Sequence, residues 1–327
     1  MTHRLKLLRA TLADAVQTAR KSTRRRIVRW RLDLTRADRE ARIDAERRLR
    51  GREQYAQLRR ADAVIVSYAK SGRTWLRVMI SRLYSQVYDL PEDTLMGFDN
   101  FHVMDRRIPR LFFTHDVYPR FFTGNFEDKR DYEGKRVLML VRDPRDVAVS
   151  QFFHWRHRTK DWKKDLNDYP PHDAEISLQE FVRQERGGLP RIIAFLNLWA
   201  KESERLRAFS LIRYEDMRAE PVAELQRVAE FLGIPADDAQ IRDAVAYASY
   251  ENMKRKEAAQ SYQMSGGRLA PGDKDNPDSY KVRRGKVGGY RDYFDDDQIA
   301  EIDAMVSNEL DPVYGYAAPR TDEQARA

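Results

Sequence analysis

A lysine, a serine and a glycine follow one another at a point where an apolar run ends and a helical pattern begins. Residues 63–67 have the composition of a short buried strand, and residues 74–87 place apolar side chains on one face of a helix. A glycine turn between a strand and a helix collects unpaired N–H groups and the positive end of the helix dipole. Lys70 adds a full charge, Ser71 a hydroxyl donor, and Gly72 a backbone that lets an anion approach closely. The segment therefore predicts a phosphate-binding loop, which differs from a Walker A loop because its lysine precedes its glycine.

An arginine follows a second apolar run and stands eight residues before a serine. Residues 137–141 are unbroken apolar, as expected of a central parallel strand covered on both faces. Asp143 and Pro144 suit the start of a following helix, so Arg142 is expected at the carboxyl end of the strand. Ligands of α/β sheets bind outside these strand ends, and Ser150 faces the same general direction about two helical turns later. Because a guanidinium fork matches a phosphate, we expect this pair to bind a second phosphate near the first loop.

A basic loop nearer the carboxyl end of the chain completes a set of three segments. Its residues 282–294 include two consecutive arginines followed by a glycine. The order of the three segments resembles that of sulfotransferases that use 3′-phosphoadenosine 5′-phosphosulfate (PAPS), of the cytosolic and bacterial sulfotransferase-domain type. The resemblance extends over about residues 62–310, although Gly289 and Tyr290 stand where the family usually has Asp-Trp.

The resemblance implies a donor site assembled from distant parts of the chain. It implies PAPS as the sulfate donor and 3′-phosphoadenosine 5′-phosphate (PAP) as the product. No metal is expected, because the histidines at 102, 154, 157 and 172 lack ligand spacing with a carboxylate partner. One loop holds the 5′-phosphosulfate, a second group of residues holds the 3′-phosphate, and two tyrosines approach the adenine. These residues are Lys70, Ser71, Gly72, Arg73, Thr74 and Trp75 for the phosphosulfate, Arg142, Ser150, Arg283, Arg284 and Gly285 for the 3′-phosphate, and Tyr214 and Tyr250 for the adenine.

Sulfuryl transfer to a hydroxyl acceptor places demands on a site that are similar to those of phosphoryl transfer. Lys70 is expected to stabilise the transferring sulfonate and the leaving phosphate. The general base is expected at His115, which follows the candidate strand 111–114. This histidine resembles the family's catalytic histidine in a Thr-His-x-x-Pro setting, here with the proline four positions after it. A carboxylate, with Asp116 the nearest, stays open as the alternative base.

We expect an α/β protein with a P-loop-like three-layer fold. Its central, mostly parallel sheet of four or five strands is flanked by helices. Residues 1–60 are expected to form a basic helical extension, residues 61–315 the sulfotransferase domain, and residues 316–327 a tail. The loop-rich segment 251–289 is expected to be irregular and to act as a lid.

The charge of the chain is concentrated in its first sixty residues. They contain 19 Lys and Arg against 7 Asp and Glu, a net of +12, so the whole-chain charge of +8 leaves −4 for the remainder. A basic helix with an apolar stripe is typical of a helix on an anionic membrane surface, and equally of a helix packed on the domain with a solvated basic face. Nucleic-acid binding is not expected, because no recognised module accompanies the charge. The stripe is Leu5, Leu8, Leu12, Ala15, Val16 and Ala19, followed by a basic cluster at 24–29 and Trp30.

Composition narrows the class of protein further. The chain has no cysteine, which excludes a disulfide framework and thiolate sites. No apolar run reaches membrane-spanning length, and the charged start does not suit a secretion signal, so we expect a cytoplasmic protein with or without peripheral membrane contact. The alternative functions are a nucleotide-dependent kinase-like phosphotransferase and a non-enzymatic adaptor at a membrane surface. The hydroxyl acceptor, whether lipid, glycan or small molecule, stays open.

Overall fold

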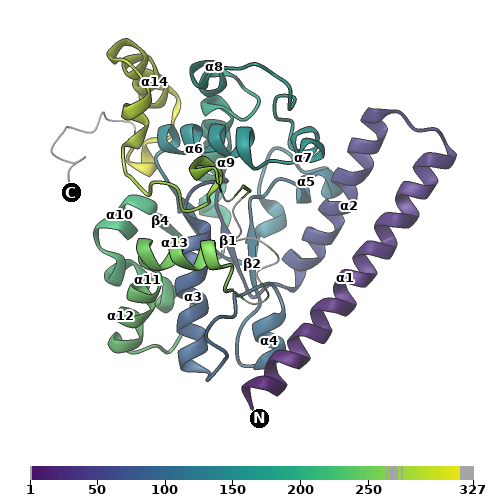
Figure 1. Ribbon diagram of the computed structural model, residues 1–327, viewed down its shortest axis with the longest axis vertical. Helices are drawn as coiled ribbons and strands as arrows, with labels where there is room; N and C mark the ends of the chain where they lie inside the picture. The colour runs from purple at the N-terminus through teal and green to yellow at the C-terminus, as the bar shows by residue number, and fades with distance from the viewer. Residues whose placement is uncertain (1, 263, 265–271, 274, 317–327) are drawn as a thin grey trace.

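A four-stranded parallel sheet forms the centre of the protein (Figure 1). The structure, a computed structural model, describes residues 2–262, 264, 272–273 and 275–316. The strands lie in the order β2-β1-β3-β4, and every pairing is parallel, so their carboxyl ends meet at one edge. Their bounds are β1 Ala63–Val66, β2 Leu111–Thr114, β3 Arg136–Val141 and β4 Ala208–Arg213.

Successive residues of the central strand enter two separate cores, because neighbouring side chains in a strand point to opposite faces. Ala63 and Ile65 of β1 join one core, and Val64 and Val66 join the other. All four are fully buried, which confirms the expected three-layer, P-loop-like α/β fold. The first core is covered by α3 Arg73–Val87, α4 Asn100–Met104, α10 Tyr214–Ala219, α11 Pro221–Leu232, α12 Asp238–Tyr247 and α13 Tyr250–Ala259. The second is covered by α2 Arg39–Arg60, α6 Pro144–His157, α8 Leu178–Arg183, α9 Leu189–Glu202 and α14 Asp296–Glu309.

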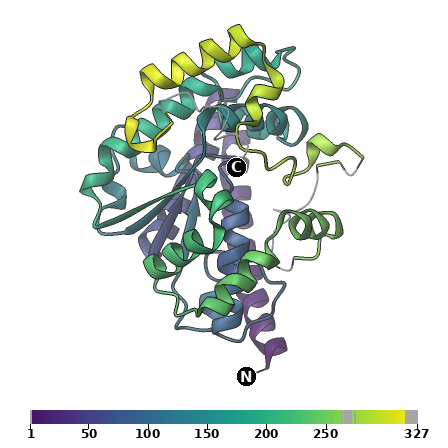
Figure 2. The same ribbon diagram turned by 90° about the vertical axis from the view of Figure 1, so that its left-hand side faces the viewer.

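Short helices and 3₁₀ turns connect these layers. Figure 2 shows α14 at the end of the molecule opposite the N-terminus. Two short helices, α5 Pro119–Thr123 and α7 Asp161–Leu166, contact α2. The 3₁₀ turns are η1 Arg130–Tyr132, η2 Ser203–Arg205, η3 Pro277–Ser279, η4 Gly289–Tyr293 and η5 Pro312–Tyr314.

The basic N-terminal segment is helical, as predicted, but a turn divides it into α1 (His3–Leu34) and α2. Asp38 begins the second helix by accepting a hydrogen bond from the Ala41 N–H at 2.8 Å. The two helices lie side by side along one edge of the molecule (Figure 1), and α1 also packs against α4. Leu58 of α2 enters the second core and Ala10 of α1 enters the first, so both helices of this hairpin are attached to the sheet domain.

The segment after residue 250 differs from its predicted irregular form, because residues 251–257 belong to α13. The Ser249 side chain caps this helix by accepting a hydrogen bond from the Asn252 N–H, and Met253 enters the first core. The charged composition of this segment did not indicate a helix, because only one face of the helix is buried. Residues 265–271 of the expected lid, and residues 317–327 of the expected tail, lie outside the described residues.

Candidate active site

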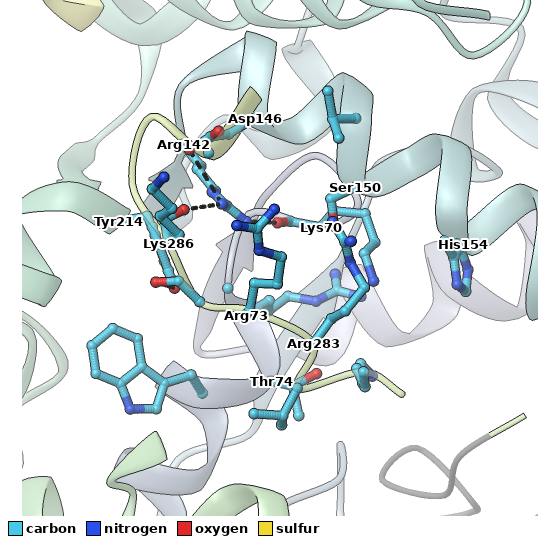
Figure 3. Close-up of a pocket in the computed structure, with 18 of the residues that line it drawn as sticks. Lys70, Arg73, Thr74, Arg142, Asp146, Ser150, His154, Tyr214, Arg283 and Lys286 are labelled. Carbon is cyan, nitrogen blue, oxygen red and sulfur yellow. Dashed lines mark hydrogen bonds and ion pairs between the residues drawn. The ribbon is translucent and has the colours of Figure 1, made fainter. Parts of the chain in front are cut away.

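A cavity of about 270 Å³ opens at the carboxyl edge of the sheet and gathers the predicted site residues (Figure 3). All of the predicted residues except Ser71 line this cavity, although they come from segments as far apart as residues 70 and 285. Ser71 is buried beneath the loop instead. In Figure 3 the side chains of Lys70, Arg73, Arg142 and Arg283 approach one space, and His154 stands to the side.

One position of the first loop has a backbone conformation that requires glycine. Gly72 has φ +92° and is the N-cap of α3. A Cβ at this position would lie 2.6 Å from Cδ2 of Tyr214, so both its φ and its contact require glycine. Lys70 also has a positive φ of 74°, which is uncommon outside glycine. The loop is therefore held in a strained shape at the start of a helix, as expected of an anion-binding turn.

The Lys70 ammonium lies among cationic groups. The residue keeps partial solvent exposure because it faces the cavity, but protein atoms surround its side chain. Burial, reinforced by the charges of Arg158, Arg142 and Arg283, lowers the pKa of Lys70 to about 7. A bound anion would offset this repulsion and favour the charged lysine.

Arg142 joins the three predicted segments. It follows β3 directly and donates hydrogen bonds to the Lys286 carbonyl at 3.0 Å and to the Lys70 carbonyl at 3.5 Å. Its guanidinium also lies 3.2 Å from the Asp146 carboxylate and 4.6 Å from the centre of the Tyr214 ring. The predicted juxtaposition of Arg142 with the Lys70 loop is therefore confirmed, since β1 and β3 are paired neighbours.

Aromatic side chains form another part of the cavity wall. The rings of Trp75 and Tyr214 meet edge to face at 5.8 Å, and the Trp75 Nε1–H donates to the Ala248 carbonyl at 2.9 Å. The Tyr250 hydroxyl donates to the Arg283 carbonyl at 2.9 Å. These contacts connect the first loop, α13 and the basic loop around a surface on which a nucleobase can stack.

The basic loop presents its two arginines differently. Arg283 lies 4.0 Å over the Phe153 ring and donates to the Tyr293 hydroxyl at 2.6 Å, which directs it inward. Arg284 pairs with Asp292 and is 42% exposed, so it lies at the rim. Tyr290, one of the departures from the family pattern, is buried against α6, with its N–H donating to Asp146.

His115 occupies the carboxyl end of β2, as predicted. Its Nδ1 lies 2.8 Å from the Ser67 carbonyl and its Nε2 lies 2.6 Å from the Arg73 guanidinium. The carbonyl requires a proton on Nδ1, so Nε2 carries the lone pair. Burial, together with the Arg73 charge, holds the pKa of His115 well below its usual range. Asp116 does not line the cavity; its carboxylate instead accepts from Lys129 at 2.7 Å.

The prediction from sequence missed several ionisable cavity residues, among them Asp146, His154, Arg158 and Lys281. Three of them have a periodic signal, because Asp146, His154 and Arg158 continue the four-residue spacing that contains Ser150 along α6. Asp146 accepts hydrogen bonds from the Gly288 and Tyr290 N–H groups at 2.9 Å, and so it fastens the basic loop to α6. The fourth, Lys281, lies two positions before Arg283, within the loop-rich segment.

The charge of the cavity fits a nucleotide that carries several negative groups. Among the described lining residues, nine lysines and arginines face a single carboxylate, that of Asp146. Within the same described part of the chain, no group of three His, Cys, Asp or Glu side chains is placed to hold a metal ion. The described helices also include none that is long and apolar enough to cross a membrane. The nine are Lys70, Arg73, Arg142, Arg158, Arg218, Lys281, Arg283, Arg284 and Lys286.

Comparison with known proteins agrees with this geometry. Residues 60–313 match the family model described as the sulfotransferase domain. The chain is 27% identical over 258 residues to human sulfotransferase 6B1, covering 76% of this chain and 75% of the relative. It is 23% identical over 266 residues to flavonol 3-sulfotransferase of Flaveria bidentis, covering 76% and 81% respectively.

Solved structures share the fold. The structure of mouse sulfotransferase SULT7A1 complexed with PAP superimposes with a TM-score of 0.52 at 20% identity, covering 81% of this chain and 92% of that one. Retinol dehydratase in complex with androsterone and PAP gives a TM-score of 0.51 at 20% identity, covering 80% and 83%. The kinase-like alternative is not favoured by any of these matches. The chain therefore belongs to the sulfotransferase domain family and is a PAPS-dependent sulfotransferase.

Proposed function

We propose that the cavity binds PAPS through the predicted residues and transfers its sulfuryl group to a hydroxyl acceptor. The convergence of Arg142 with the Lys70 loop supports this assignment most directly, because it places two anion-binding groups in one space. Lys70, Gly72, Arg73 and Thr74 hold the 5′-phosphosulfate end, while Ser71 belongs to the same loop but is buried and does not line the cavity. Arg142, Ser150, Arg283, Arg284 and Gly285 hold the 3′-phosphate, and Trp75, Tyr214 and Tyr250 enclose the adenine.

When bound, PAPS supplies the sulfuryl group and the leaving 5′-phosphate. The acceptor oxygen forms a bond to sulfur as the bridging sulfur–oxygen bond breaks. His115 Nε2 takes the proton of the acceptor hydroxyl, and Lys70 stabilises the charge that develops on the leaving oxygen. Because Arg73 donates to this same Nε2 at 2.6 Å, the acceptor hydroxyl has to replace Arg73 at the histidine. Once displaced from the histidine, Arg73 is proposed to stabilise the negative charge of the transferring sulfonate.

Replacing Arg142 with alanine should weaken PAP far more than adenosine 5′-phosphosulfate. Only PAP carries the 3′-phosphate that Arg142 is proposed to hold, and a charge-assisted hydrogen bond contributes about 1.5–3 kcal/mol. The affinities of both nucleotides for both proteins can be measured by titration calorimetry. Arg136→Ala, at the other end of β3, is the matched control and should leave both affinities unchanged. Equal losses for the two nucleotides in Arg142→Ala would place the 3′-phosphate elsewhere.

The affinity for PAP should fall as the pH rises through about 7. Lys70 has a pKa lowered to about 7, so it is charged below that pH and loses its proton above it. Since PAP binds the charged form, its affinity should decrease by up to about tenfold per pH unit above this value. Titration calorimetry over a pH series, in buffers with different ionisation enthalpies, would measure both the slope and the proton uptake. A Lys70→Met variant with the same slope as the wild type would show that another group is responsible.

The acceptor is proposed to be an alcohol or a phenol. Solved relatives hold androsterone or retinol, both alcohols, together with PAP, which supports a hydroxyl-bearing class without selecting one member. Incubating the protein with PAPS and with lipid or polar extracts, followed by mass spectrometry, should reveal products heavier by one SO₃ group. If the same products formed when the protein was omitted, the reaction would not be enzymatic.

We also propose that the chain divides into a basic helical extension (1–60), a sulfotransferase domain (61–315) and a tail (316–327). We propose in addition that the protein is cytoplasmic and associates peripherally with anionic membrane through the extension. The end of α2 at Arg60 and the family match from residue 60 support the first boundary. Tyr316, the first residue of the proposed tail, is buried in the second core, so the proposed tail begins packed against the sheet domain.

A further inference from the structure

One face of α1 has an apolar stripe that recurs every eleven residues. Its nine positions follow one another by steps of three, four and four, and seven of them hold large apolar side chains. An eleven-residue repeat corresponds to about 3.67 residues per turn, so the stripe stays on one side of a nearly straight helix. This outer stripe consists of Leu5, Leu8, Leu12, Val16, Ala19, Thr23, Ile27, Trp30 and Leu34.

The outer stripe points away from the protein. All nine residues are exposed, with Leu12 at 59%, Trp30 at 61% and Leu34 at 64%. Among the described residues, seven of the eleven exposed large apolar side chains lie on this stripe. The opposite face of α1 is the one that packs on α2 and α4, where Lys6 and Ala10 are buried. The helix therefore packs on the domain with a solvated basic face, as the alternative describes, but it packs through the face opposite the outer stripe.

Cationic side chains border the outer stripe. Arg9, Arg20 and Arg31 recur with the same eleven-residue spacing and run beside it, and all three are exposed. Between residues 20 and 31 the helix has seven Lys and Arg, and no acidic residue occurs from 15 to 32. Arginine stems can cover apolar surface while their guanidinium groups reach outward to anionic groups.

We propose that the outer stripe is a membrane-docking face, with α1 lying in the plane of a bilayer that contains anionic lipid. The apolar side chains enter the acyl boundary, Trp30 sits at the headgroup level, and the arginine row binds lipid phosphates. At about 1.5 Å per residue, this 32-residue helix presents about 48 Å of contact along the surface. The proposal defines the surface for the peripheral association proposed above and is independent of the sulfuryl-transfer chemistry.

A bilayer fits this face better than a second copy of the chain. In a dimer formed through the outer stripe, the arginine row of one helix would lie beside cationic residues of the other, since the same region has no acidic partner between 15 and 32. An anionic bilayer instead complements the charge along the whole face. A dimer would be the outcome that overturns the proposal.

The test is co-sedimentation of the full chain with vesicles of phosphatidylcholine alone or with added phosphatidylserine. We expect binding to the anionic vesicles at low salt, at least tenfold weaker binding at high salt, and little binding to neutral vesicles. The triple variant Ile27→Ser, Trp30→Ser, Leu34→Ser should lose at least tenfold in affinity. The matched control Phe126→Ser, Trp162→Ser, Val313→Ser removes similarly exposed apolar groups elsewhere and should bind like the wild type.

PAP affinity, measured on the same preparations, separates loss of docking from loss of folding or of donor binding. A stripe variant that binds PAP normally but not vesicles supports the proposal. Equal vesicle binding by the stripe and control variants would overturn it, as would a wild-type protein that stays in the supernatant. Light scattering after size exclusion provides a further arm, because a dimer that disappears in the stripe variant would show that a second copy covers this face.

Discussion

Replacing Lys70 with alanine is expected to abolish turnover while PAP still binds, though more weakly. The Lys70 charge is proposed to stand where the bridging oxygen of the donor becomes negative, and losing such a contact costs on the order of 3–4 kcal/mol, about 10²–10³-fold in rate. The ground state loses less, because Arg142 and Arg283 also line the cavity and keep holding the nucleotide. Single-turnover rates with PAPS, paired with PAP affinity, measure the two effects separately.

Lys201→Ala is the control for this experiment, since Lys201 is an exposed lysine on α9 away from the cavity. Its rate and its PAP affinity should equal those of the wild type. Near-normal turnover in a folded Lys70→Ala protein would remove Lys70 from the mechanism.

Replacing His115 with alanine is expected to slow the chemical step by at least about 10²-fold, with PAP affinity largely kept. The Ser67 carbonyl fixes the ring so that its lone pair is on Nε2, and the lowered pKa keeps the imidazole neutral and able to accept a proton at neutral pH. Without this ring, the site loses the group that is proposed to accept the acceptor's proton. Rapid-quench single-turnover measurements isolate this step from product release.

His102→Ala controls for the loss of a partly buried imidazole. His102 also bonds a carbonyl, that of Ile108 at 2.7 Å, but it does not line the cavity. This control should keep the wild-type rate. If His115→Ala transferred sulfate at the wild-type rate with normal PAP affinity, another group would have to act as the base, and Asp116 would be a poor candidate because Lys129 and Tyr132 already bind its carboxylate.

The sequence predicted well which side chains meet at the carboxyl edge of the sheet, because these residues follow strands. Lys70, His115 and Arg142 come just after β1, β2 and β3, and the parallel sheet brings these three ends together whatever the loops do. Gly72 and Ser150 are near the same strand ends and follow the same rule. Local sequence patterns were sufficient to predict these positions, because the sheet brings the ends of its strands together.

The residues that the sequence did not predict depend on contacts between distant segments. Asp146 matters because it binds two N–H groups of a loop some 140 positions later, and nothing near it in the chain indicates that partner. The pairing of Arg73 with His115 crosses 42 positions in the same way. The exposure of the outer stripe could not be predicted either, because either face of α1 could have packed on the protein. The fold shows that the less apolar face is the one that packs.

The contact between Gly72 and Tyr214 couples two parts of the cavity wall. The turn that is proposed to receive one end of the nucleotide lies directly against the ring that is proposed to receive the other, with no room for even a methyl group between them. A side chain at position 72 would therefore displace both the turn proposed to bind phosphate and the ring proposed to bind the adenine.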